Sequence, residues 1–101
     1  MRVWFNPKAK ADLQAAVRYI AVDSKMAARR WSMSIREECT NLGATPGLGV
    51  PKPELGLTVR MLVVRSYLIF YETGTNGVEI LRIMHGARDW QEILSPQTLR
   101  N

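Results

Sequence analysis

Three β-type segments separated by two tight turns occupy residues 58–85, and this pattern limits the fold more than any other feature. Thr58 to Val64 alternates in character, and Tyr67 to Thr73 is rich in aromatic and branched residues. Arg65-Ser66 forms the first turn, and the segment 74–77 ends in Asn-Gly, a strong hairpin signal. Two consecutive hairpins, with a last strand that ends at His85, predict a three-stranded antiparallel meander.

Two amphipathic helices are predicted before the meander. Residues 2–5 form a short strand, and Asn6-Pro7 then gives a helix start, because Asn caps free N–H groups and proline suits the first helical position. Apolar residues at helical spacing extend this helix to Val22. Ser24 caps a second helix, which we expect to end at a glycine cap, Gly43. The short connection between them predicts an antiparallel helix hairpin.

The expected fold class is therefore α+β: an N-terminal strand, a two-helix antiparallel hairpin, a three-stranded antiparallel meander and a short C-terminal helical turn. We expect Asp89 to cap this turn, Trp90 and Leu94 to anchor it, and Pro96 to stop it. Residues 44–57 contain three prolines and three glycines and form a long loop. Residues 1–95 make one domain, and residues 96–101 make a C-terminal tail.

The charge is unevenly distributed along the chain. The formal net charge is +5, and residues 1–43 carry eight Lys or Arg against four Asp or Glu. A basic surface favours an acidic partner.

A single cysteine, Cys39, excludes an internal disulfide and a cysteine metal site, and we expect neither metal nor cofactor. No signal peptide or membrane-spanning run is present in the sequence, which predicts a cytoplasmic protein without a membrane or small-molecule partner.

The residues that could carry chemistry are four arginines and one histidine. The arginines are Arg60, Arg65, Arg82 and Arg88, all in the meander or at its exit. An arginine in an apolar strand must face solvent, pair with an acid or await an anion. Pairing would join Arg88 to Asp89 or Glu92, and Arg82 to Glu72 or Glu79. His85 ends the last strand, where it could act as an acid or base or simply bond to the backbone.

The last strand and its exit, residues 78–89, end in His-Gly-Ala-Arg-Asp and resemble the ending of ParE toxins in the RelE/ParE superfamily. The early strand, Pro7, the helix hairpin, Pro46-Gly47-Leu48-Gly49 and the strand arginine Arg60 match in order. The resemblance covers residues 2–94. It implies a toxin of a type II toxin–antitoxin system with a cognate ParD-like antitoxin. The two proteins are expected to form a hetero-oligomer, either a heterotetramer or a larger assembly. It also implies DNA gyrase as the target.

The resemblance leaves a second interpretation open, because RelE-like members cut messenger RNA on the ribosome. Cleavage at a 2′-hydroxyl needs a base, an acid and cations around the phosphate. Here the base would be Lys52 or Glu54, the acid His85, and the phosphate-binding cations Arg60 and Arg82. The set is incomplete, since no tyrosine follows Tyr71, so gyrase inhibition is the favoured interpretation and the chain is expected to act by binding. A third interpretation is a domain that has lost its toxicity. The sequence shows no disrupted hydrophobic core, so this interpretation ranks last.

If the chain acts by binding, the basic helix hairpin and the C-terminal turn are the expected surfaces for its target. The candidate residues for contact with the target or partner are Arg60, Arg82, Arg88, Asp89 and Trp90. Some of these, notably Arg82, Arg88 and Asp89, could instead hold the end of the sheet to the body of the protein through ion pairs. A meander with free edges and an excess of apolar surface also predicts that an antitoxin helix or strand covers part of the sheet.

Overall fold

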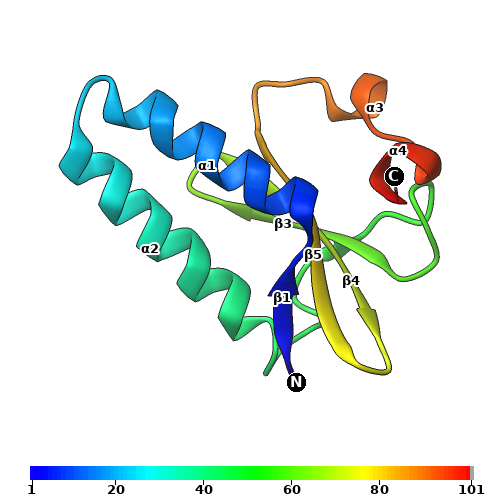
Figure 1. Ribbon diagram of the computed structural model, residues 1–101. Helices are drawn as coiled ribbons and strands as arrows, with labels where there is room; N and C mark the ends of the chain where they lie inside the picture. The colour runs from blue at the N-terminus through cyan, green and yellow to red at the C-terminus, as the bar shows by residue number, and fades with distance from the viewer. Residues whose placement is uncertain (101) are drawn as a thin grey trace.

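The computed structural model describes residues 1–100 and confirms the α+β architecture. Figure 1 shows a twisted sheet with the α1–α2 hairpin on one side and two short C-terminal helices on the other. The elements, in chain order, are β1 Val3–Phe5, α1 Pro7–Ala21, α2 Lys25–Asn41, β2 Val50–Pro51, β3 Val59–Val64, β4 Tyr67–Gly74, β5 Gly77–His85, α3 Trp90–Ile93 and α4 Pro96–Arg100.

The sheet contains the predicted meander and two further strands. Its order is β1-β5-β4-β3-β2, with β3, β4 and β5 antiparallel. β1 pairs with β5 in parallel, with Val3 opposite Val78. The two-residue strand β2 lies within the segment expected to be a loop and pairs with Arg60 and Met61 of β3. Both outer strands are short, so much of β3 and β5 lacks a neighbouring strand on its outer side.

The local signals at the helix starts are confirmed, and one at a helix end is wrong. The side chains of Asn6 and Ser24 accept hydrogen bonds from the backbone N–H groups of Ala9 and Ala27, at 2.8 and 3.0 Å. Gly43 does not adopt the left-handed conformation of a glycine cap. A Cβ there would lie 2.3 Å from the carbonyl oxygen of Met1, so a glycine is needed for the close approach of the N-terminus.

One face of the sheet packs against the helix hairpin. Leu13 of α1 and Ile35 of α2 are buried against Ile69, Tyr71 and other residues of the sheet. Burying these side chains supplies most of the hydrophobic stabilisation on this side, at about 1.5–3 kcal/mol for each large apolar residue. The periodicity of the two helices therefore predicts their packing correctly.

The other face of the sheet is covered by the chain's own C-terminal segment. Trp90, Leu94 and Leu99 are buried there against Phe70, Leu81 and other residues of the sheet. Pro96 does not end the helical structure but begins α4, as proline can at a first helical position. Residues 96–100, expected to be part of a tail, therefore contribute to the core through Leu99.

Candidate functional site

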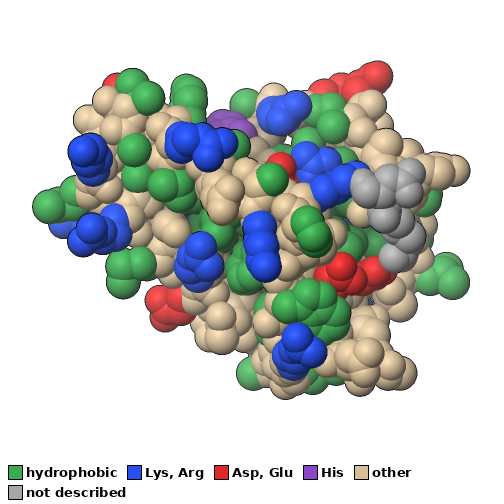
Figure 2. Space-filling view, viewed as in Figure 1, with side chains coloured by type: hydrophobic (Ala, Val, Ile, Leu, Met, Phe, Trp, Pro, Cys, Tyr) green, Lys and Arg blue, Asp and Glu red, His purple; other side chains and the backbone are tan. Residues whose placement is uncertain are grey.

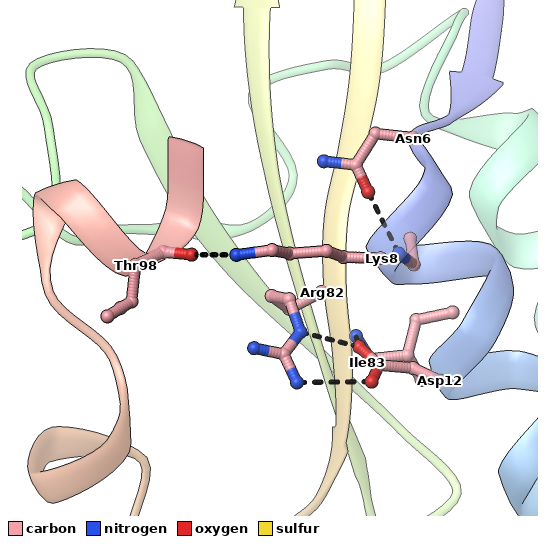
Figure 3. Close-up of polar contacts among 7 residues, drawn as sticks. Asn6, Lys8, Asp12, Arg82, Ile83 and Thr98 are labelled. Atoms are coloured by element: carbon pink, nitrogen blue, oxygen red, sulfur yellow. Dashed lines mark hydrogen bonds and ion pairs between the residues drawn. The ribbon is translucent and has the colours of Figure 1, made fainter. Parts of the chain in front are cut away.

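The side chain of Arg82 is held by a carboxylate on α1. Its Nε and Nη2 donate to the two carboxylate oxygens of Asp12 at 2.7 and 3.1 Å, and the backbone N–H of Ile83 donates to the same carboxylate at 2.9 Å. Figure 3 shows Arg82 reaching from β5 to α1, beside Lys8, whose amine donates to the carbonyl oxygen of Thr98. The prediction that Arg82 pairs within the fold is right, but its partner is Asp12, because β5 lies beside α1.

An irregularity in the sheet places Arg82 on the same face as Phe70 and Met84, opposite the face that packs on the helix hairpin. The register shifts between Phe70 and Tyr71 of β4, so that Phe70 faces Arg82, Tyr71 faces Ile80, and Leu81 is an extra residue on β5. Such a bulge bends a strand and changes the direction of the next side chain. Asp12 also caps the N–H of Ile83 beyond the end of β1, where β5 has no neighbouring strand.

His85 and Arg88 lie together at the exit of β5. The Nδ1 of His85 accepts a hydrogen bond from the N–H of Ala87 at 3.0 Å, and the ring contacts Tyr67 edge-on. Both side chains are exposed and line an open groove of about 540 Å³ between α1 and the exit, with Tyr19 on the opposite wall. Within residues 1–100 the structure shows no ion pair between Arg88 and either Asp89 or Glu92.

Asp89 and Trp90 have different environments although they are adjacent. Asp89 is exposed and occupies the position before α3, but its side chain makes no capping hydrogen bond, contrary to the prediction. Trp90 is buried, with its ring 5.4 Å from that of Phe70. The amine of Lys52 lies 5.2 Å from the Trp90 ring, a cation–π distance. Trp90 is therefore an anchor for the C-terminal segment, as predicted, and its indole faces the core.

Arg60 and Tyr71 together hold the glycine-containing loop. One Nη of Arg60 donates to the carbonyl oxygens of Gly47 and Gly49, at 3.2 and 2.7 Å. The hydroxyl of Tyr71 donates to the carbonyl of Pro46 at 2.7 Å and accepts from the N–H of Gly49 at 2.8 Å. Burial raises the pKa of Tyr71, while the Gly49 hydrogen bond and Arg60 partly oppose that rise. These residues fix the loop on the sheet.

The five residues that a ribonuclease would need are not brought together. Arg60 on β3 is paired with Tyr71 on β4, and Tyr71 is paired with Ile80 on β5. His85 lies further along β5 than Ile80, by about 15 Å at a rise of about 3.3 Å per residue. The N–H of Lys52 bonds to Val59, near the Arg60 end. Arg60 and His85 line two different grooves, and neither groove is lined by another of the five residues, which are His85, Arg60, Arg82, Lys52 and Glu54. His85 and Arg60 therefore cannot act on one phosphate in this arrangement.

The structure also shows surface features that the sequence did not single out. Exposed apolar side chains gather on the helix hairpin, among them Tyr19 at 77% exposure, Val22 at 84% and Met33 at 65%. Their positions outside the apolar stripe of each helix are the signal that could have identified them. Nowhere in residues 1–100 do three or more metal-binding side chains gather, and none of the helices there has the length and apolarity needed to cross a membrane.

The comparisons with known proteins agree with this fold. The family model described as "ParE toxin of type II toxin-antitoxin system, parDE" matches residues 3–90. A solved structure of the chromosomal ParDE toxin–antitoxin system from P. aeruginosa superimposes with a TM-score of 0.71 at 24% sequence identity, covering 84% of this chain and 95% of the other. No curated protein sequence matches. Because the family model spans most of the chain, the protein belongs to the family of ParE toxins of type II toxin–antitoxin systems.

Proposed function

We propose that the protein inhibits DNA gyrase by binding to it, and that a cognate ParD-like antitoxin neutralises it. Membership of the ParE toxin family is the observation that carries the proposal. The separation of His85 from Arg60 favours binding over RNA cleavage, because acid, base and phosphate-binding groups must converge within hydrogen-bonding distance. Gyrase acts on cytoplasmic DNA, so the same proposal places the toxin in the cytoplasm.

Among the candidate contact residues, Arg88 and Asp89 are the exposed ones. Arg82, Arg60 and Trp90 are engaged with Asp12, the loop carbonyls and the core. We therefore assign gyrase contact to the β5 exit, residues 85–89, beside its open groove. The side chains of Arg82 and Trp90 contribute indirectly by holding that exit in place.

The test is the supercoiling of relaxed plasmid by purified gyrase, with and without the protein. The proposal expects loss of supercoiling and accumulation of cleaved DNA, with mRNA intact in a parallel translation extract. Arg88→Glu should abolish inhibition with an unchanged melting temperature, whereas Arg65→Glu, an exposed arginine in the β3–β4 turn, should retain it. Normal supercoiling beside cut mRNA would overturn the proposal, and His85→Ala would then be the variant to examine.

A further inference from the structure

The open groove beside the β5 exit is bounded on one side by a single face of α1. Asp12, Ala15, Ala16 and Tyr19 follow one another at i, i+3, i+4 and i+7, and all four line the groove. The two alanines have small side chains, so they leave a hollow between the side chains of Asp12 and Tyr19. This stripe is separate from the apolar stripe that packs α1 on the sheet.

Three rings border this groove: Tyr19 from α1, Tyr67 from β4 and His85 at the end of β5. Tyr19 is 77% exposed, and the rings of Tyr67 and His85 lie 5.1 Å apart. Burial raises the pKa of Tyr67, and Tyr19 raises it further, so the two tyrosines are close enough to interact. Trp31 packs against Tyr67 at 4.7 Å and supports its ring. The exposed rings offer flat surfaces to a planar ligand.

The groove presents positive charge because its acid is already paired. Among the residues that line it, Asp12 is the acid, and its carboxylate accepts hydrogen bonds from Arg82 and from the N–H of Ile83. Arg88 also lines the groove, is exposed, and takes part in no ion pair within residues 1–100. Lys and Arg side chains predominate over acidic ones on the face seen in Figure 2, in keeping with the net charge of +5. A ligand that is both planar and anionic fits these groups.

The backbone holds the exit that carries His85 and Arg88 in a fixed shape. The N–H of Gly86 donates to the carbonyl oxygen of Ser66 at 2.7 Å, and the N–H of Arg88 donates to that of His85 at 3.0 Å. The N–H of Ala87 bonds to the His85 ring. A ligand therefore meets a preformed edge and does not have to order a loop.

We infer that this groove binds single-stranded DNA, with an unpaired base stacked on Tyr19 and Tyr67 and a neighbouring phosphate on Arg88. Sites for single strands combine cations that follow the backbone with aromatic side chains on which bases stack. An acidic peptide would satisfy Arg88, but a carboxylate does not cover aromatic faces as a planar base does. The origin of the strand rests on the proposed function, because the DNA that gyrase cuts has ends with unpaired bases.

The test is fluorescence anisotropy with a fluorescein-labelled oligothymidylate of about 12 nucleotides, within the usual size of such sites. Tyr19→Ala should weaken binding roughly tenfold, the effect expected from the loss of one stacked base. Met33→Ala is the matched control and should bind normally, because Met33 is 65% exposed on α2 and does not line the groove. Binding should also weaken as salt is raised.

A second pair of variants tests the hollow without changing any charge. Ala15→Leu fills the groove and should weaken binding, whereas Ala11→Leu, at an exposed position of α1 outside the groove, should not. Melting temperatures should be unchanged in both. Equal affinities within this pair, or equal affinities of Tyr19→Ala and Met33→Ala, would overturn the inference, because the strand would then be held by general attraction alone.

Competing ligands decide the chemistry of the occupant. Adding the complementary strand should reduce binding, since a duplex hides the faces of its bases, and a tighter-bound duplex would overturn the inference. ATP carries a base and phosphates but no strand. Displacement by ATP at the concentration of the oligonucleotide would show that the ligand is a free nucleotide, and stronger binding of an RNA of the same length would exclude DNA as the preferred strand.

The supercoiling assay separates this inference from the proposed function. Tyr19→Ala should need a higher concentration than the unsubstituted protein to inhibit gyrase. If the unsubstituted protein binds the strand through Tyr19 but does not inhibit gyrase, the proposed function fails and the DNA site stands. If it inhibits gyrase and binds no strand, the DNA site fails and the groove belongs to the contact with the gyrase protein.

Discussion

Removing the carboxylate of Asp12 should destabilise the protein by about 3 kcal/mol. Asp12→Ala deletes the acceptor of three hydrogen bonds, two from Arg82 and one from the N–H of Ile83. Hydrogen bonds to charged groups contribute about 1.5–3 kcal/mol each, but their effects do not add within one network. Breaking a fully buried pair costs about 3–5 kcal/mol. Both side chains here are 18% exposed, which lets water reach the orphaned guanidinium and places the loss at the lower end.

Urea unfolding followed by far-UV circular dichroism measures this loss. The midpoint should fall with no change in m, because the surface exposed on unfolding is the same. For a domain of this size the melting temperature should fall by about 10–20 °C. Asp12→Asn keeps the shape and one acceptor oxygen, so it should cost less, about 1–2 kcal/mol.

A double-mutant cycle separates the pair from its surroundings. Asp12→Ala and Arg82→Ala in one chain should cost less than the sum of the two single changes, with a coupling of at least about 1 kcal/mol. Additive losses, or an Asp12→Ala variant within about 0.5 kcal/mol of the unsubstituted protein, would refute the view that this pair locks β5 to α1.

Three further predictions concern the loop, the buried thiol and the C-terminal anchor. Gly49→Ala puts a Cβ 2.7 Å from the hydroxyl of Tyr71 and should cost about 1–3 kcal/mol, whereas Gly47→Ala meets no atom within 4 Å and should be neutral; equal melting temperatures would contradict this. Burial, the largest cause, raises the pKa of Cys39 from 9.0 to about 12, so the stability it contributes is complete below pH 9 and is lost as the pH rises toward 12. Urea unfolding across that range should show a shallower fall for Cys39→Ala, and identical slopes would count against the assignment. Trp90→Ala should cost about 3–5 kcal/mol and lose toxicity only together with stability; a stable variant without toxicity would place the indole on the target surface.

The helix starts and the meander were predictable because their signals are local. Asn6 and Ser24 bond to N–H groups three residues away, and the β3–β4 turn lies between segments of strand-like composition. The antiparallel pairing then follows from chain connectivity, since strands joined by a tight turn must run side by side. Turns, caps and periodicity therefore account for most of the fold.

The remaining features depend on contacts between distant parts of the chain. Asp12 and Arg82 are separated by 70 residues, and nothing near either one selects the other over Glu72 or Glu79. Gly43 resembles a helix cap in sequence, yet its conformation serves the approach of Met1. The second face of the sheet is covered by a C-terminal segment whose last helix begins with a proline. A proline is compatible both with the end of one helix and with the start of another, so the sequence did not decide between them.

The positions of the arginines argue for where recognition occurs. An arginine in an apolar strand suggests an anion site, but Arg60 and Arg82 already donate to oxygens of the protein itself. A phosphate or carboxylate could engage them only by displacing those oxygens, which would release the loop or the end of β5. Arg29 and Arg88 have no such engagement among the described contacts, and each borders an open groove. Binding to these cations breaks no contact within the fold, so the grooves beside Arg29 and Arg88 are the surfaces on which partners should bind.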